Sequence, residues 1–161
     1  MTKEDRIQDR FDTWPEPYRA DAHKIYSAYK QQFRTFPSSK AHHGAYEGGL
    51  YDHTDNVMQC VRVLYTPYMS LLREHPFTVE KAEYTAFLHD FGKIPQQTIK
   101  PFKMHYFWIF DMLKDLDIEV DDEMVNALFH HHGGWGPSGE LSPLAVFIHA
   151  CDMWASQVME K

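Results

Sequence analysis

Residues 87–93 read FLHDFGK, and they combine an apolar helical pattern with a histidine and an aspartate side by side. Ala82, Ala86 and His89 recur at helical spacing, so His89 falls on the apolar face of the expected helix. The glycine at position 92 is typical of a helix end. A buried carboxylate costs several kcal/mol when it has no partner, so the His-Asp pair requires polar partners from elsewhere in the chain.

Helical periodicity continues on both sides of this stretch. Thr78 can cap a helix start, because an oxygen-bearing side chain can accept from the first free N–H groups, and Ser142-Pro143 suits the last helix start with Ser as the cap. Asp121 and Asp122 suit a further helix start, because acidic side chains favour the positive end of a helix. Glycine and proline place loops at 35–49 and 133–141. No alternating pattern typical of a strand occurs, and we therefore expect an all-α fold. The expected helices cover about residues 16–33, 50–64, 78–90, 102–116 and 121–131, with a final helix from 142.

Length and composition predict one domain that needs no disulfide. The chain has 161 residues, of which 43% are hydrophobic and 15% aromatic, which suits a single core. Cys60 and Cys151 match no metal-knuckle spacing and are expected to be buried apolar side chains. No signal peptide opens the chain, and the aromatic stretch at 102–113 is too short and too polar to span a bilayer. We expect a soluble, cytoplasmic protein without membrane contact.

The charge and the histidines point to a small substrate and a metal. The formal net charge is −7 and there is no basic run, whereas proteins that bind long nucleic acids neutralise phosphates with a basic face. The chain holds 11 histidines, most of them clustered at 42–53, 89–105 and 130–149. Histidine is a common metal ligand, so the clusters predict a metal site.

Four expected helices each carry one ionisable residue on their apolar face. One buried histidine is more often a hydrogen-bonded core residue than a ligand. Four such positions, together with the adjacent Asp90, suggest convergence on one cation whose charge offsets the desolvation of the carboxylates. Imidazole and carboxylate ligands suit Mn, Fe, Co, Ni, Zn or Mg rather than a thiolate-bound metal, and we expect Mn, Fe, Co or Ni ahead of Mg or Zn. The four residues are His53, His89, His105 and Asp152.

The order His53, His89-Asp90, Asp152 resembles the H…HD…D signature of HD-superfamily metal-dependent phosphohydrolases. Three local stretches add to the resemblance. Residues 42–54, HHGAYEGGLYDHT, are similar to the HHAxxGGLxxHT stretch in the HD domains of YhaM-type exoribonucleases and of some conjugative relaxases. Residues 87–93 are similar to LLHDIGK, and residues 150–156, ACDMWAS, to the final helix of the family.

The resemblance implies a compact helical bundle with the metal site at its centre. It covers about residues 35–157, so that about 1–34 form a helical N-terminal extension of a single HD domain over 1–161. Such domains often self-associate, which leaves a homo-oligomer open. YhaM-type enzymes carry a further nucleic-acid-binding domain for which this chain has no room, and with the acidic charge this favours a small phosphorylated nucleotide over a polymer.

Members of this superfamily hold one or two metal ions. With two ions, Asp90 would bridge them, His53, His89 and Asp152 would bind one, and His105 with His131 the other. In the alternative with one ion, His105 is a core residue and residues 130–132 are a polar helix end. Two ions about 3.5–4 Å apart can lower the pKa of a water between them and hold phosphate oxygens for in-line attack.

Asp90, Lys93 and His132 are the residues expected to act in catalysis. By resemblance, Lys93 would neutralise a phosphate oxygen or support Asp90; the alternative is a solvated residue near a helix end. His132 would be a metal ligand or a donor to the phosphate, because the triplet at 130–132 leaves the ligand register open.

Three loop residues are expected to contact substrate. His43 and Glu47 precede His53 and could touch the substrate or relay a proton. Trp135, in the glycine-rich loop, could stack on a base, and its alternative is a loop anchor packed on the core.

The predicted function is hydrolysis of a phosphoester or phosphoanhydride bond of a mononucleotide, cyclic nucleotide or short oligonucleotide. Other HD chemistries stay open at this stage. The chain could be a dNTP triphosphohydrolase or a 5′-nucleotidase with one metal, a di-iron oxygenase, or a module that binds nucleotide without catalysis.

Overall fold

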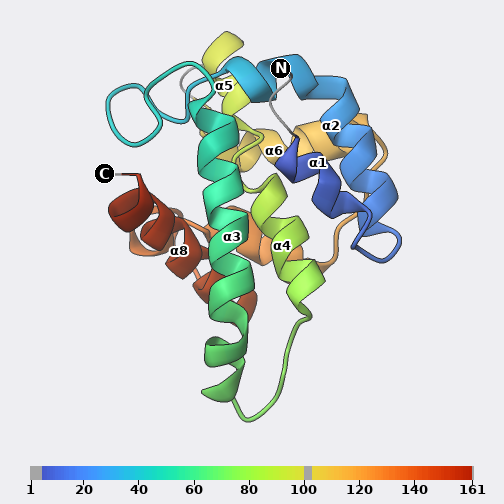
Figure 1. The fold of residues 1–161 in the computed structure, drawn as a ribbon, viewed down its shortest axis with the longest axis vertical. Coiled ribbons are helices and arrows are strands. Elements are labelled where there is room, and N and C mark those ends of the chain that lie inside the picture. Colours follow the sequence, from blue (N-terminus) through green and yellow to red (C-terminus); the bar gives the residue numbers. More distant parts are fainter. Residues whose placement is uncertain (1–4, 100–102, 161) are drawn as a thin grey trace.

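Helix α3 (Gly49–Ser70) runs through the middle of the structure, and the other helices are arranged around it (Figure 1). The computed structural model describes residues 5–99 and 103–160. Helices α4, α8 and α2 pack on α3, and α7 packs on α8. The buried face of α3 includes Leu50, Val57, Met58 and Val61, all inaccessible to solvent. The remaining helices bury their apolar stripes on this centre because each stripe must leave water.

The described residues are helical apart from turns and loops, with no strand in 5–99 or 103–160, so the all-α prediction is confirmed. None of the described helices has the length and apolarity that crossing a membrane requires. Besides α3, the elements are α1 (Arg6–Phe11), α2 (Tyr18–Thr35), α4 (Val79–Leu88), α5 (Lys93–Thr98), α6 (His105–Asp115), α7 (Asp122–His130), the 3-10 turn η1 (Gly133–Trp135), α8 (Pro143–Trp154) and the π-helical segment η2 (Ala155–Met159).

The predicted caps Thr78 and Ser142 are confirmed, and Asp121, expected only as an acidic residue at a helix start, caps its helix as well. The side chains of Thr78, Asp121 and Ser142 accept hydrogen bonds from backbone N–H groups three residues later, at 3.1, 2.9 and 3.1 Å respectively. These bonds satisfy donors that have no partner within the helix. The expected start of the fourth predicted helix at Phe102 lies outside the described residues.

Helix α3 extends six residues beyond its predicted end, since it ends at Ser70 rather than at residue 64. Its apolar stripe stops near Leu64, but Tyr65 and Tyr68 continue the burial by packing their rings on Phe77 and Phe147. Tertiary packing therefore extends the helix beyond the point at which its own sequence pattern weakens.

The turn after the HD pair also differs from the prediction. The helix expected to run to about Asp90 and to end before Gly92 ends at Leu88, and a new short helix, α5, begins at Lys93. Pro95 lies in its first turn, where a missing N–H costs nothing. Because α4 ends at Leu88, the residues His89 and Asp90 lie in the tight connection between the two helices.

Asp5 ties the first three helices together. Its side chain caps α1 by accepting from the Gln8 N–H at 3.1 Å, and it also accepts from Tyr26 at 2.6 Å, Tyr51 at 3.1 Å and Arg34 at 2.8 Å. Burial opposes its ionisation, but these hydrogen bonds outweigh burial and lower the pKa of Asp5 below its ordinary value. The ionised carboxylate therefore stabilises the fold.

We expect Asp5→Ala to lower the free energy of unfolding by about 2 kcal/mol, because a cap is lost and buried hydroxyl donors lose their acceptor. The exposed Asp9→Ala in the same helix is the control and should change it by less than about 0.5 kcal/mol. Since the pKa of Asp5 is lowered, its contribution is complete above the ordinary value of 3.8 and is lost as pH falls through the folded pKa. Urea unfolding of both variants from pH 7 to 2.5 measures this. If the difference in the free energy of unfolding between Asp5→Ala and the wild type does not become smaller in acid, the ionised Asp5 carboxylate does not stabilise the fold.

Candidate metal centre

The first group of candidate ligands, His53, His89, Asp90 and Asp152, comes together from three places in the fold. His53 lies on α3, the HD pair in the turn after α4, and Asp152 on α8. The Nε2 atom of His53 lies 3.0 Å from Asp152 Oδ1 and 3.5 Å from Asp90 Oδ2. The Nε2 atom of His89 lies 3.4 Å from Asp90 Oδ2. All four side chains are buried.

Two atoms of this group, His89 Nε2 and Asp90 Oδ1, are buried without a hydrogen bond to any described residue, and His53 Nε2 faces the Asp152 carboxylate. The other ring nitrogen of each histidine is occupied, since His89 Nδ1 donates to the Ala86 carbonyl at 2.5 Å and His53 Nδ1 faces Glu160 at 3.0 Å. With Nδ1 protonated, His89 Nε2 presents a lone pair to the shared space, whereas the contact between His53 Nε2 and Asp152 needs a proton or a cation between the two atoms. Orphaned lone pairs beside two carboxylates fit a divalent cation.

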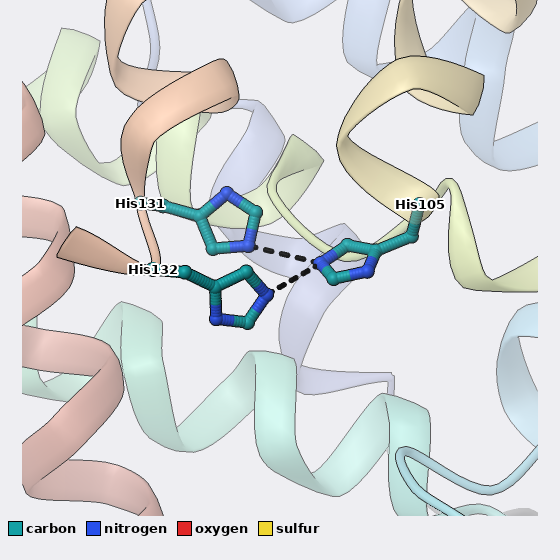
Figure 2. Close-up of side chains that lie close together, drawn as sticks. All are labelled: His105, His131 and His132. Atoms are coloured by element: carbon teal, nitrogen blue, oxygen red, sulfur yellow. Dashed lines mark hydrogen bonds between the residues drawn. The ribbon is translucent and has the colours of Figure 1, made fainter. Parts of the chain in front are cut away.

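The second group consists of His105, His131 and His132, whose rings face one another in Figure 2. The Nε2 atom of His105 lies 3.1 Å from that of His131 and 3.0 Å from that of His132. His131 Nδ1 donates to the Leu128 carbonyl at 2.7 Å, so its Nε2 carries a lone pair. A neutral imidazole has only one N–H, and three converging Nε2 atoms fit a shared cation better than mutual hydrogen bonding.

Asp90 lies between the two groups. Its Oδ2 faces the first group, whereas its Oδ1 lies 3.3 Å from His105 Nε2 and 3.8 Å from His131 Nε2. The structure thus brings His53, His105 and His131 close to Asp90, as expected from the sequence, and their role as metal ligands stays a prediction. His132, whose role the sequence left open, lies with its Nε2 in the ligand position of the second group.

Burial and charge set the protonation of these groups in opposite ways. Burial lowers the pKa of His131 to about 3, with neighbouring histidines adding to the effect, and it lowers the pKa of His105 and His132 as well. Burial also opposes a charge on His53, but the hydrogen bonds and charges of Asp152 and Glu160 outweigh it and raise the pKa to about 9. The second group is therefore neutral and ready to ligate at pH 7.

The two carboxyls of the centre remain ionised despite their burial. Burial raises the pKa of Asp90, but the charges of His89 and Lys93 prevail and hold it well below its usual range. Hydrogen bonding and charge from His53 do the same for Asp152. Two buried carboxylates, with the neutral imidazoles of the second group on one side, attract a divalent cation.

Lys93 supports Asp90 directly. Its Nζ donates to Asp90 Oδ2 at 2.7 Å and lies 3.4 Å from Ser38 Oγ. This position differs from that of a solvated residue at a helix end, and it fits the alternative in which Lys93 supports Asp90. Lys93 also lines the cavity beside the centre, so it can reach a substrate phosphate as well.

A cavity of about 680 Å³ opens beside the two groups. Two of the three residues that were expected to contact substrate, His43 and Trp135, line this cavity. Glu47 is exposed and does not line it. The His43 ring lies 4.7 Å from that of His53. Trp135 is 76% exposed, so it is not a loop anchor packed on the core.

Two close backbone approaches bring the parts of the centre together. A Cβ on Gly92 would lie 1.9 Å from the His105 carbonyl oxygen, so only glycine lets the start of α6 reach the HD turn. A Cβ on Gly49 would lie 2.0 Å from the Gly44 carbonyl oxygen, which allows the loop with His43 to fold against the start of α3.

Glu160 is a site residue that sequence reasoning missed. Both of its carboxylate oxygens lie 3.0–3.1 Å from His53 Nδ1. The family resemblance ended near residue 157, and no helical pattern indicated that the chain turns back to the centre beyond it. The π-helical geometry of η2 is what places Glu160 there.

Comparison with known proteins gives one finding. A family model of the HD domain matches residues 50–155, which is more than half of the chain. No curated protein and no solved structure matches the chain, so the closer likeness to YhaM-type exoribonucleases stays a prediction. Every residue of both candidate ligand groups lies inside the matched range. The chain therefore belongs to the HD domain family, whose members are in general metal-dependent phosphohydrolases.

Proposed function

We propose that the protein hydrolyses a phosphoester or phosphoanhydride bond of a nucleotide at a two-metal HD centre. The observation that carries this proposal is the position of Asp90, whose two oxygens face separate sets of imidazoles. One buried carboxylate between two ligand groups is the arrangement that a bridging ligand requires. A ligand set rich in imidazole favours Mn, Fe, Co or Ni over Mg or Zn.

Divalent ions at this centre would supply an activated water and would hold the phosphate oxygens for in-line attack. The chain's own residues orient the ligand Asp90 and neutralise the charge of the phosphate. Asp90 is fixed by the Lys93 ammonium, whose three N–H groups are not exhausted by Asp90 and Ser38 among the described contacts. The remaining N–H can pair with a phosphate oxygen in the cavity. The Nε2 atom of His132 faces His105, which leaves Nδ1 for a contact in the cavity.

The cavity supports a small nucleotide as substrate. Its volume of about 680 Å³ lies in the range of ordinary ligand sites. Lys93 and His132 lie on the side of the metal centre, where a phosphate would bind, and the exposed ring of Trp135 lines the same cavity. An exposed indole beside a phosphate site suits stacking on a base. The net charge of −7 favours a mononucleotide, cyclic nucleotide or short oligonucleotide over a long polymer.

Asp90→Asn should abolish metal-dependent hydrolysis, with a loss of about a thousandfold or more, because the carboxylate that serves both ligand groups becomes neutral. Nucleoside monophosphates, cyclic nucleotides, triphosphates and dinucleotides, each assayed with Mn, Co, Fe and Mg, form the substrate panel. Metal should also raise the unfolding temperature of the wild type but not of this variant.

The exposed His75→Ala is the matched control for surface histidine binding and should behave as the wild type. Full activity of Asp90→Asn would refute the proposed function. Consumption of oxygen without release of a phosphate product would instead assign the centre to an oxygenase.

Trp135→Ala should raise KM for a nucleotide about tenfold and leave kcat nearly unchanged, because stacking on a base contributes about 1–3 kcal/mol of binding. Trp135→Phe retains a ring and should recover most of the affinity. An aryl phosphate without a base serves as the second control. If Trp135→Ala raises KM equally for the nucleotide and for the aryl phosphate, the ring does not contact the base.

A further inference from the structure

The candidate ligand histidines differ in the group that pairs with Nδ1, the ring nitrogen that points away from the metal position. His89 and His131 donate from Nδ1 to backbone carbonyls three residues earlier in the chain. His53 instead meets the carboxylate of Glu160, a residue 107 positions later. A ligand histidine paired with a carboxylate is oriented and made more basic, and loss of such a partner typically costs 10–100-fold in metal affinity.

The fold brings Glu160 to His53 by a local change of helix type. Helix α8 carries Asp152 and passes into the π-helical segment η2 at Ala155. The backbone N–H of Glu160 then bonds to the Ala155 carbonyl at 3.1 Å, five residues back. The Glu160 side chain is only 7% exposed and lies beside the cavity. π-Helical turns often occur at functional sites, and this one turns a carboxylate toward a buried ligand.

The two ligand groups therefore differ in negative charge. The first group contains Asp90 and Asp152 and has Glu160 behind it. The second group consists of three imidazoles and shares only Asp90. Affinity for a divalent cation rises with the number of carboxylates around it, so the first group should bind more tightly.

We propose that Glu160 is a positioning residue that fixes His53 and makes the first group the tighter of the two metal positions, so that it fills first. This inference rests on the proposed two-metal centre. It assigns Glu160 no contact with substrate, and its effect is exerted on the metal through His53.

Titration of metal-free protein with Co²⁺, followed by calorimetry and by visible absorption, tests the proposal. The wild type should bind in a tight step and a weaker step. Glu160→Gln, which retains the shape but removes the charge, should weaken the tight step 10–100-fold and change the weaker step by less than about threefold. The absorption of the first Co²⁺ should change with it. The exposed Glu119→Gln is the matched control and should leave both steps unchanged.

A tight step that Glu160→Gln leaves within twofold of the wild type overturns the proposal, even if its activity falls. If Glu160→Gln does not fold, Glu160→Asp, which shortens the reach but retains the charge, is judged by the same twofold limit. Failure of the proposed function gives a different result, because then the wild type binds no Co²⁺ or Asp90→Asn binds it as the wild type does.

Discussion

The arrangement of the centre depends on how the buried carboxylate of Asp90 is compensated by its charged and polar neighbours. Asp90 is 2% exposed, and an unpaired carboxylate at such a position would cost several kcal/mol. Lys93 supplies one charged partner, but Asp90 Oδ1 makes no hydrogen bond to a described residue. The ring nitrogens around it come from separate helices, and the fold places each of them by packing that helix on α3 or on its neighbours. A cation between these atoms relieves the desolvation that the apolar surroundings impose.

Much of this centre could be predicted because its ligands violate the apolar pattern of their helices. His53 and Asp152 each occupy a position where the stripe demands a hydrophobic side chain, and such a substitution persists only when something compensates for it. Cap residues such as Ser142 likewise predict helix starts, because their hydrogen bonds are local in the sequence. The sequence failed where the structure depends on distant packing. The added turns of α3 rest on Phe77 and Phe147, and Glu160 reaches His53 through a π-helical segment that no periodicity indicates.

The residues that hold the centre and the residues that form the cavity wall have different structural origins. His53, His105 and Asp152 lie in helices, and the other candidate ligands lie in the turns directly after α4 and α7, so the packing of these helices fixes their positions. His43 and Trp135 belong to connections held by glycine-dependent turns, where Gly49 and Gly133 make close backbone or ring approaches. Loop residues can change without altering the core. The sequence pattern therefore predicts the candidate ligands on and beside the helices, whereas it predicts little about the loops that line the cavity.

The buried ligands also affect the stability of the metal-free protein. In the absence of metal, the centre places two carboxylates and several imidazoles in a volume that hydrophobic side chains would fill more favourably. Lys93, Glu160 and the backbone carbonyls that accept from His89 and His131 offset part of this cost, but His89 Nε2 and Asp90 Oδ1 keep no hydrogen-bond partner among the described residues. Metal binding supplies the missing interactions, and its free energy is thereby coupled to folding. The ligand set therefore lowers the stability of the metal-free protein, which is the relation expected when residues serve chemistry rather than the core.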